Sequence, residues 1–175
     1  MPVVNLNKTH AEMAADIIRD AGGEVVGRTR LQKMAYLLEI TGLGADFSFE
    51  YRHYGPYSEQ LANEITAACF WDMISEVEHT AVWGGSYSIF KALQSNPKGK
   101  IKPARKEIID LAKDANPITL ELAATAAFLA KEGDSDPWSE TSRRKPEKAA
   151  KYLDDARNLY ARLLKVKTPN PLPAI

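Results

Sequence analysis

Apolar residues recur at helical spacing along most of the chain. Thr9 and Glu12 form a capping-box pattern that opens the first helix, and Gly22-Gly23 ends it. Asn116-Pro117, an N-cap residue followed by proline, opens another helix. Together these signals predict six helices, over about residues 8–21, 29–41, 58–72, 104–115, 117–131 and 146–166.

Shorter stretches alternate between apolar and polar residues, as half-buried strands do. One of them predicts a strand over 47–54, followed by a turn at Gly55-Pro56. Two β-prone runs around a Gly-Gly turn predict a hairpin of residues 74–82 and 87–92. The segment 24–27 is long enough only to connect two helices or to add one bridge to a sheet.

Three helices followed by a hairpin is the element order of a winged helix-turn-helix domain. The predicted fold is therefore mainly α within the α+β class. It consists of a winged-helix-like N-terminal layer with a small hairpin and strand insertion, packed with C-terminal helices.

The composition is that of an ordinary globular domain, with 45% hydrophobic and 26% charged residues among 175. It excludes a disordered or collagen-like chain. Cys69 is the single cysteine, which excludes an internal disulfide and favours a reducing compartment. We find neither a membrane-spanning run nor a secretory signal, so we expect a cytoplasmic protein.

The net charge of zero, from 23 basic and 23 acidic residues, hides a division of the chain. Residues 1–96 carry 7 Lys+Arg against 12 Asp+Glu, and residues 97–175 carry 16 against 11, so the two parts have net charges of −5 and +5. We predict a winged-helix-like portion over 1–96, a helical extension over 97–167 packed on it, and a Pro-rich tail over 168–175, all in one compact unit. We expect the tail to be a frayed end, with a docking peptide as the alternative.

Catalytic and metal-binding patterns are missing from the sequence. His10, His53 and His79 fall in different elements at no metal-ligand spacing, and Cys69 lies on an apolar helical stripe. Neither phosphate-binding glycine loops nor nucleophile motifs are present. We therefore expect a non-enzymatic protein without a cofactor or metal; an enzyme with an unrecognised site is the weaker alternative.

Charge also bears on nucleic-acid binding. The predicted third helix, 58–72, carries acidic residues and neither Lys nor Arg, which disfavours docking against phosphates. Basic residues instead cluster in the C-terminal half, where they form a candidate anion or nucleic-acid patch or a solvated surface. These residues are Lys98, Lys100, Lys102, Arg105, Arg143, Arg144 and Lys145.

Two segments combine arginine with aromatic residues, the types that anchor protein interfaces. They are 27–36 and 49–58. Core packing accounts for some of these aromatic rings but less readily for the charged residues. The predicted partner-binding residues are Arg28, Arg30, Lys33, Arg52, His53, Tyr54, Gly55 and Pro56.

These same segments carry a family resemblance. Leu31-Gln32-Lys33-Met34-Ala35-Tyr36 and Tyr54-Gly55-Pro56-Tyr57 resemble the Panacea (SocA-like) antitoxin domain, and the start of the first segment is similar to YwgA-like proteins. The resemblance covers about residues 8–95 and implies a non-enzymatic, α-rich domain. It implies a protein partner, such as a toxin or a protease substrate. The leading prediction is thus a protein-binding regulator, antitoxin-like or adaptor-like; a winged-helix regulator that binds nucleic acid through the basic C-terminal clusters is the alternative.

Overall fold

The computed structural model describes residues 9–94 and 101–175. Within these ranges the chain forms seven helices and two small antiparallel sheets. The helices are α1 (His10–Asp20), α2 (Arg28–Ile40), α3 (Glu59–Phe70), α4 (Pro103–Asp114), α5 (Pro117–Lys131), α6 (Pro137–Arg144) and α7 (Pro146–Leu164). The strands are β1 (Glu24–Val26), β2 (Glu50–Arg52), β3 (Gly55–Tyr57), β4 (Ile74–Thr80) and β5 (Ser86–Ala92).

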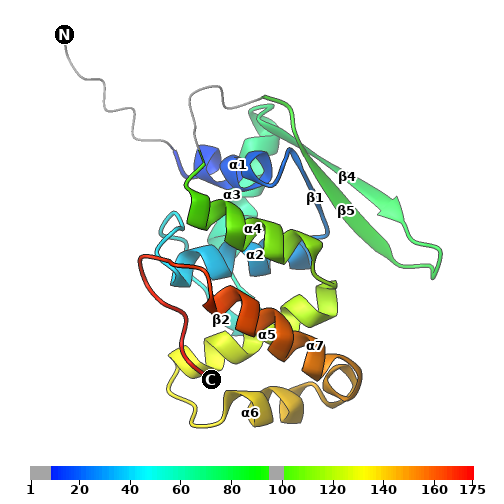
Figure 1. The fold of residues 1–175 in the computed structure, drawn as a ribbon. Coiled ribbons are helices and arrows are strands. Elements are labelled where there is room, and N and C mark those ends of the chain that lie inside the picture. Colours follow the sequence, from blue (N-terminus) through cyan, green and yellow to red (C-terminus); the bar gives the residue numbers. More distant parts are fainter. Residues whose placement is uncertain (1–8, 95–100) are drawn as a thin grey trace.

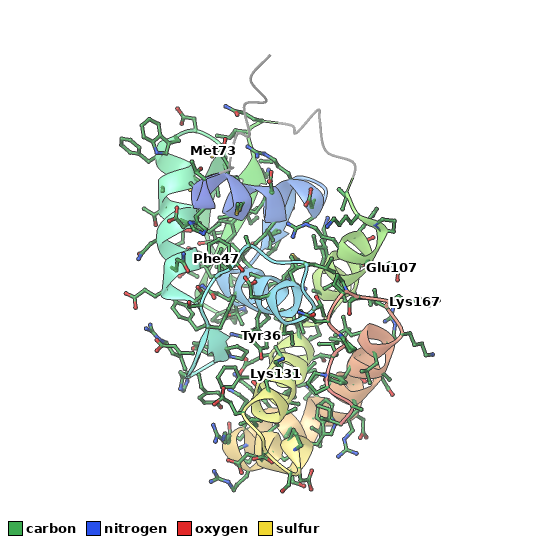
Figure 2. All side chains as sticks on the ribbon, turned by 90° about the vertical axis from the view of Figure 1, so that its left-hand side faces the viewer. Tyr36, Phe47, Met73, Glu107, Lys131 and Lys167 are labelled. Atoms are coloured by element: carbon green, nitrogen blue, oxygen red, sulfur yellow. The ribbon has the colours of Figure 1, made fainter. Side chains whose placement is uncertain are left out.

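The helices surround α2, and the larger sheet extends from their side. This sheet has the strand order β1-β5-β4, and its β4–β5 hairpin projects away from the helices (Figure 1). In the orthogonal view α2 lies between α3 and α4, with α5 beneath it (Figure 2). None of the described helices combines the length and apolar character that a membrane-spanning helix requires.

Residues from both halves of the chain share one hydrophobic core. Met34 and Leu37 of α2 are fully buried in the same cluster as Leu120 of α5 and Tyr160 of α7. Burial of such apolar surface is the main favourable term in folding. The charge crossover at residues 96–100 lies outside the described residues, and the division into two portions stays a prediction.

The predicted α+β class with a dominance of helices is confirmed, as are the capping box of α1 and the Asn116 cap of α5. The winged-helix comparison stays a prediction. Residues 24–27 do more than the connection or single bridge that the sequence predicts. β1 pairs with β5 over three residues, and Val25 is buried, because the hairpin supplies a long-range partner that a local pattern cannot reveal.

The strand predicted over 47–54 and its Gly55-Pro56 turn are wrong in extent. β2 begins only at Glu50, because side chains take the preceding backbone donors: Glu39 accepts from the Phe47 N–H at 2.7 Å. The reversal falls at residues 53–54, and Gly55 and Pro56 belong to β3. The predicted apolar alternation nevertheless holds, since Phe47 is buried and the polar residues of β2 are exposed.

Two further differences concern the C-terminal part. Helix α6 was not predicted, although Asp136-Pro137 repeats the cap-and-proline signature of α5, and the Asp136 side chain caps it. The tail is not frayed, because it packs back on the helices. Leu172 is buried, the Tyr160 hydroxyl donates to the Pro173 carbonyl at 2.6 Å, and the Asn170 N–H donates to the Thr41 carbonyl at 3.0 Å.

Candidate functional site

A hollow lined mainly by charged and aromatic side chains lies between the β2–β3 hairpin and the junction of α6 with α7. Its volume is about 880 Å³. Four of its lining residues are cationic, and they come from both halves of the chain. We call it the basic hollow; it is lined by Tyr51, Arg52, His53, Arg144, Lys145, Pro146, Glu147 and Lys148.

Helix α5 lies behind these segments and contacts both of them. Glu121, Thr125 and Phe128 follow one another at three- and four-residue spacing, so they lie on one face of α5. Phe128 contacts the Tyr51 ring of β2, with a centroid distance of 5.9 Å. Glu121 contacts Lys145 and Lys148 of the α7 N-terminal turn. One helix face therefore fixes both walls of the basic hollow.

Glu121 is a buried carboxylate that receives two lysines. The Lys145 Nζ donates to it at 2.7 Å, and the Lys148 Nζ donates to its two oxygens at 2.9 and 2.8 Å. Lys145 also donates to the His53 carbonyl at 2.9 Å, which attaches the β2–β3 turn to the start of α7. Buried charges need such pairing, because desolvation otherwise destabilises the fold.

A third lysine is buried next to this pair. Lys33 of α2 is only 1% exposed, and its Nζ donates to the Pro56 carbonyl at 2.7 Å. Burial lowers the pKa of Lys33 to about 8; Glu121 opposes that shift, whereas Lys145 and Lys148 add to it. Lys33 therefore shares an electrostatic environment with the wall of the basic hollow.

Positive charge exceeds negative charge in this environment. The one buried carboxylate of Glu121 faces three lysines, which are Lys33, Lys145 and Lys148. Two of these lysines are buried, so solvent screens the excess only weakly. The α7 N-terminus adds to it, because its cap residue, Lys145, provides no side-chain cap and the helix dipole is positive there.

Arginine and tyrosine side chains form the rim of the basic hollow. The Arg144 guanidinium lies over the Tyr51 ring, 4.7 Å from its centroid, and the Lys148 ammonium lies 4.9 Å from that of Tyr54. Tyr54 is 53% exposed, so its ring remains available for contact. Arg52 ion-pairs with two exposed acidic residues, Glu50 and Glu59. The rim thus offers cations and aromatic faces together.

The predicted partner-binding residues do not form one surface. Arg52, His53 and Tyr54 are exposed at the rim of the basic hollow, whereas Arg28 is exposed beside β4 and ion-pairs with Glu76 at 2.7 Å. Arg30 donates to three carbonyls at the C-terminal end of α4: those of Ala112, Lys113 and Ala115. It therefore satisfies acceptors that a helix end leaves unpaired.

The remaining three, Lys33, Gly55 and Pro56, are buried and present no surface to a partner. They explain instead how the two segments 27–36 and 49–58 are joined in the fold. Gln32 exchanges two hydrogen bonds with the Ser58 backbone, at 2.9 and 2.8 Å, and Lys33 binds the Pro56 carbonyl. The two segments therefore clamp α2 to β3 and the start of α3.

The predicted anion patch is also divided. Arg144 and Lys145 line the basic hollow, and Arg143 is exposed next to it, ion-paired with Glu140. Arg105 instead binds Asp20 and the Leu43 carbonyl, both at 2.7 Å, which holds α4 against the N-terminal helices. Lys102 is exposed before α4, and Lys98 and Lys100 lie outside the described residues.

Lys148 falls in the same basic stretch of the sequence as Arg144 and Lys145, but sequence reasoning did not identify Glu121. The available signal was a lone acidic residue inside the apolar run of 117–130, since a buried charge requires a partner. Within 9–94 and 101–175, no group of three or more His, Cys, Asp or Glu side chains is placed to hold a metal ion.

Comparison with known proteins identifies a relative. The chain is 28% identical over 128 residues to the uncharacterized protein YwgA of Bacillus subtilis (strain 168), which covers 70% of this chain and 75% of that protein. This similarity supports the relation to YwgA-like proteins that the sequence predicts. No protein-family model matches the chain. No solved structure matches it either.

Proposed function

We propose that this protein is a non-enzymatic, protein-binding regulator, antitoxin-like or adaptor-like, whose basic hollow receives an acidic segment of its partner. The partner class, a toxin or a protease substrate, follows from the resemblance of the two sequence segments to the Panacea domain. The observation that carries the proposal is the excess of buried lysine charge around Glu121. An acidic side chain of a partner would neutralise that excess.

The shape and composition of the site favour a protein segment. Arg and Tyr dominate binding hot spots because they combine a large contact area with hydrogen-bonding groups. Arg52, Arg144, Tyr51 and Tyr54 supply both around one concave surface. The β2–β3 hairpin, which carries three of them, is attached to α7 through Lys145, so little order has to be gained on binding.

Nucleic-acid binding is the second candidate, because the same rim combines cations with exposed aromatic rings. The arrangement of charges around the hollow favours a nucleic acid less than it favours a protein. A phosphate backbone needs several cations along a track, whereas here Glu50 and Glu59 flank Arg52, and Glu147 lines the hollow. The third helix and the β4–β5 hairpin up to residue 90 contain neither Lys nor Arg.

The test is a cross-linking and pull-down experiment from the native cell with the full chain as bait. The double variant Arg52→Gln/Arg144→Gln removes two rim charges, and Lys151→Gln/Arg162→Gln removes two exposed charges elsewhere on α7 as a matched control. We expect a stoichiometric protein partner that the first variant loses and the control retains. Equal recovery by both variants would refute the assignment of the site.

A second measurement separates the two candidates. Fluorescence anisotropy with single-stranded RNA and with duplex DNA at low salt should show no binding. Tight binding that falls steeply with salt concentration, and that depends on Arg52 and Arg144, would replace the protein-binding proposal with the nucleic-acid one.

A further inference from the structure

Strand β4 forms an edge of the larger sheet and has no strand on its outer side in the described part of the chain (Figure 1). Two hydrogen bonds show which of its backbone groups point outward. The Leu93 N–H donates to the Met73 carbonyl at 3.0 Å, and the Ala81 N–H donates to the Gly85 carbonyl at 2.7 Å. Because backbone groups alternate between the two sides of an antiparallel strand, the outward groups are those of Glu76, Glu78 and Thr80.

The Glu76 backbone agrees with this alternation. It hydrogen-bonds the Cys69 side chain of α3, which lowers the pKa of that thiol against the larger upward effect of burial. Helix α3 therefore lies beside the outer side of β4 at Glu76. Farther along the strand, Glu78 and Thr80 are exposed, and their outward backbone groups face away from β5.

Large apolar side chains are exposed around this edge. Phe70 and Trp71 lie just before β4 and are 77% and 65% exposed, and Trp83 in the hairpin turn is 79% exposed. Val77 is half exposed and lies in one cross-strand row with the exposed Val26, since both are register partners of the same β5 residue. Exposed apolar groups thus flank β4 at both ends and lie beside its middle, which is typical of a surface that contacts another molecule.

Charge determines what this surface can bind. Glu76 and Glu78 lie on the opposite face of β4 from Val77. Arg28 of α2 already pairs with Glu76 at 2.7 Å, so the exposed Glu78 is the carboxylate that selects the charge of a partner. An added strand would place alternate side chains beside these carboxylates and beside Val77. A second copy of β4 centred on Val77 would set Glu76 opposite Glu78, and like charges at directly opposed positions are destabilising.

We propose that the outer side of β4 binds an extended segment of a partner protein by strand addition, and that this segment alternates basic with apolar side chains. Backbone hydrogen bonds to Glu78 and Thr80 would supply affinity, and the Glu78 carboxylate and Val77 would supply the side-chain preference. The surface is separate from the basic hollow, and the proposal does not depend on that site.

The probe is a synthetic peptide that alternates lysine with valine, titrated into the full ¹⁵N-labelled chain. Amide hydrogen exchange should slow at Glu78 and Thr80, whose N–H groups point outward, and stay unchanged at Val77 and His79, which already bond to β5. A peptide of the same composition with its lysines in one block is the control. Equal responses to both peptides, or unchanged exchange at Glu78 and Thr80 at saturation, would overturn strand addition.

Two substitutions sharpen the test. Glu78→Pro deletes an outward donor while it leaves the bonds to β5 intact, and it should weaken peptide binding about tenfold. Glu78→Lys keeps the backbone and should shift preference toward a peptide that alternates glutamate with valine, so the proposal stays testable if proline disturbs the hairpin. Arg52→Gln/Arg144→Gln should bind the lysine–valine peptide normally, which separates this surface from the basic hollow. Binding unaffected by either Glu78 variant contradicts the proposal.

Discussion

The buried lysine of α2 gives a quantitative prediction about stability and pH. Lys33 is 1% exposed and its pKa is lowered to about 8 from an ordinary value of 10.5, chiefly by burial. Below pH 8 both the folded and the unfolded chain hold the proton, and the full cost of burying the charge is present. Between pH 8 and 10.5 the unfolded chain binds more protons, so stability contributed by this group rises with pH.

The size of the effect follows from the shift. Lowering the pKa from 10.5 to about 8 corresponds to about 3 kcal/mol, most of which is relieved between pH 7 and pH 10. The substitution Lys33→Met removes the charge at similar side-chain length. We therefore expect the wild-type chain to gain about 2–3 kcal/mol relative to Lys33→Met over this pH interval.

The assay is urea denaturation of both proteins at several pH values from 7 to 10, followed by tryptophan fluorescence. Comparison with Lys33→Met cancels the titration of other groups, and the exposed Lys106→Met is the control that should show no such trend. A direct NMR titration of the lysine side chain should place its pKa near 8. A pH-independent difference between wild type and Lys33→Met would refute the argument that Lys33 is buried as a charged group next to the basic hollow.

Three further substitutions test the packing around the site and the packing of the C-terminal tail. Gly55→Ala should lower the unfolding free energy by about 1–3 kcal/mol more than Gly84→Ala in chemical denaturation, and equal losses would contradict this. Both glycines have left-handed φ, +87° and +91°, but only at Gly55 would an added Cβ clash, because it would lie 2.5 Å from the Thr125 hydroxyl oxygen. Glu121→Gln should lower the unfolding free energy by about 3–5 kcal/mol, because it leaves lysine ammonium groups unpaired, and an unchanged value would mean that they are solvated. Leu172→Ala should lower the unfolding free energy from thermal denaturation by about 2–3 kcal/mol, whereas Leu93→Ala, at a half-exposed position, should change it by less than about 0.5 kcal/mol. An unchanged value for Leu172→Ala would mean that the tail is a frayed end, as the sequence predicts.

Local signals in the sequence predicted much of the helical structure. The capping box at Thr9 and the Asn116-Pro117 start correspond to observed helix ends, because capping chemistry acts within one turn of the chain. The pairing of β1 with β5 and the packing of Leu172 depend on residues far apart in sequence. Hydrophobic periodicity along one segment carries no information about such partners.

The site was predictable only in part for the same reason. Arg52 and Arg144 were each selected as residue types that bind partners, but only the fold brings them to one hollow. Lys33 was assigned to a partner surface because it lies in a segment that combines basic with aromatic residues. Its burial depends on the Pro56 carbonyl and on Glu121, which are supplied by β3 and α5. The sequence reveals the residue types, whereas the partners of each side chain follow from the tertiary arrangement.

The buried charges at the contact between α5 and α7 stabilise the fold less than apolar residues could, and this bears on the proposed function. Apolar residues of similar size are often at least as favourable as a buried ion pair, and here Lys145 and Lys148 both pair with the one carboxylate of Glu121 while Lys33 is buried nearby. The rest of the core follows the usual rules, with apolar side chains from α2, α5 and α7 packed together. Violations of those rules that are confined to one place are expected at functional sites. The lysine excess lies beside a hollow that the exposed Arg52 lines, where the proposed acidic partner group would reach it. On that proposal, the cost to stability and the capacity to bind an anion would have the same origin.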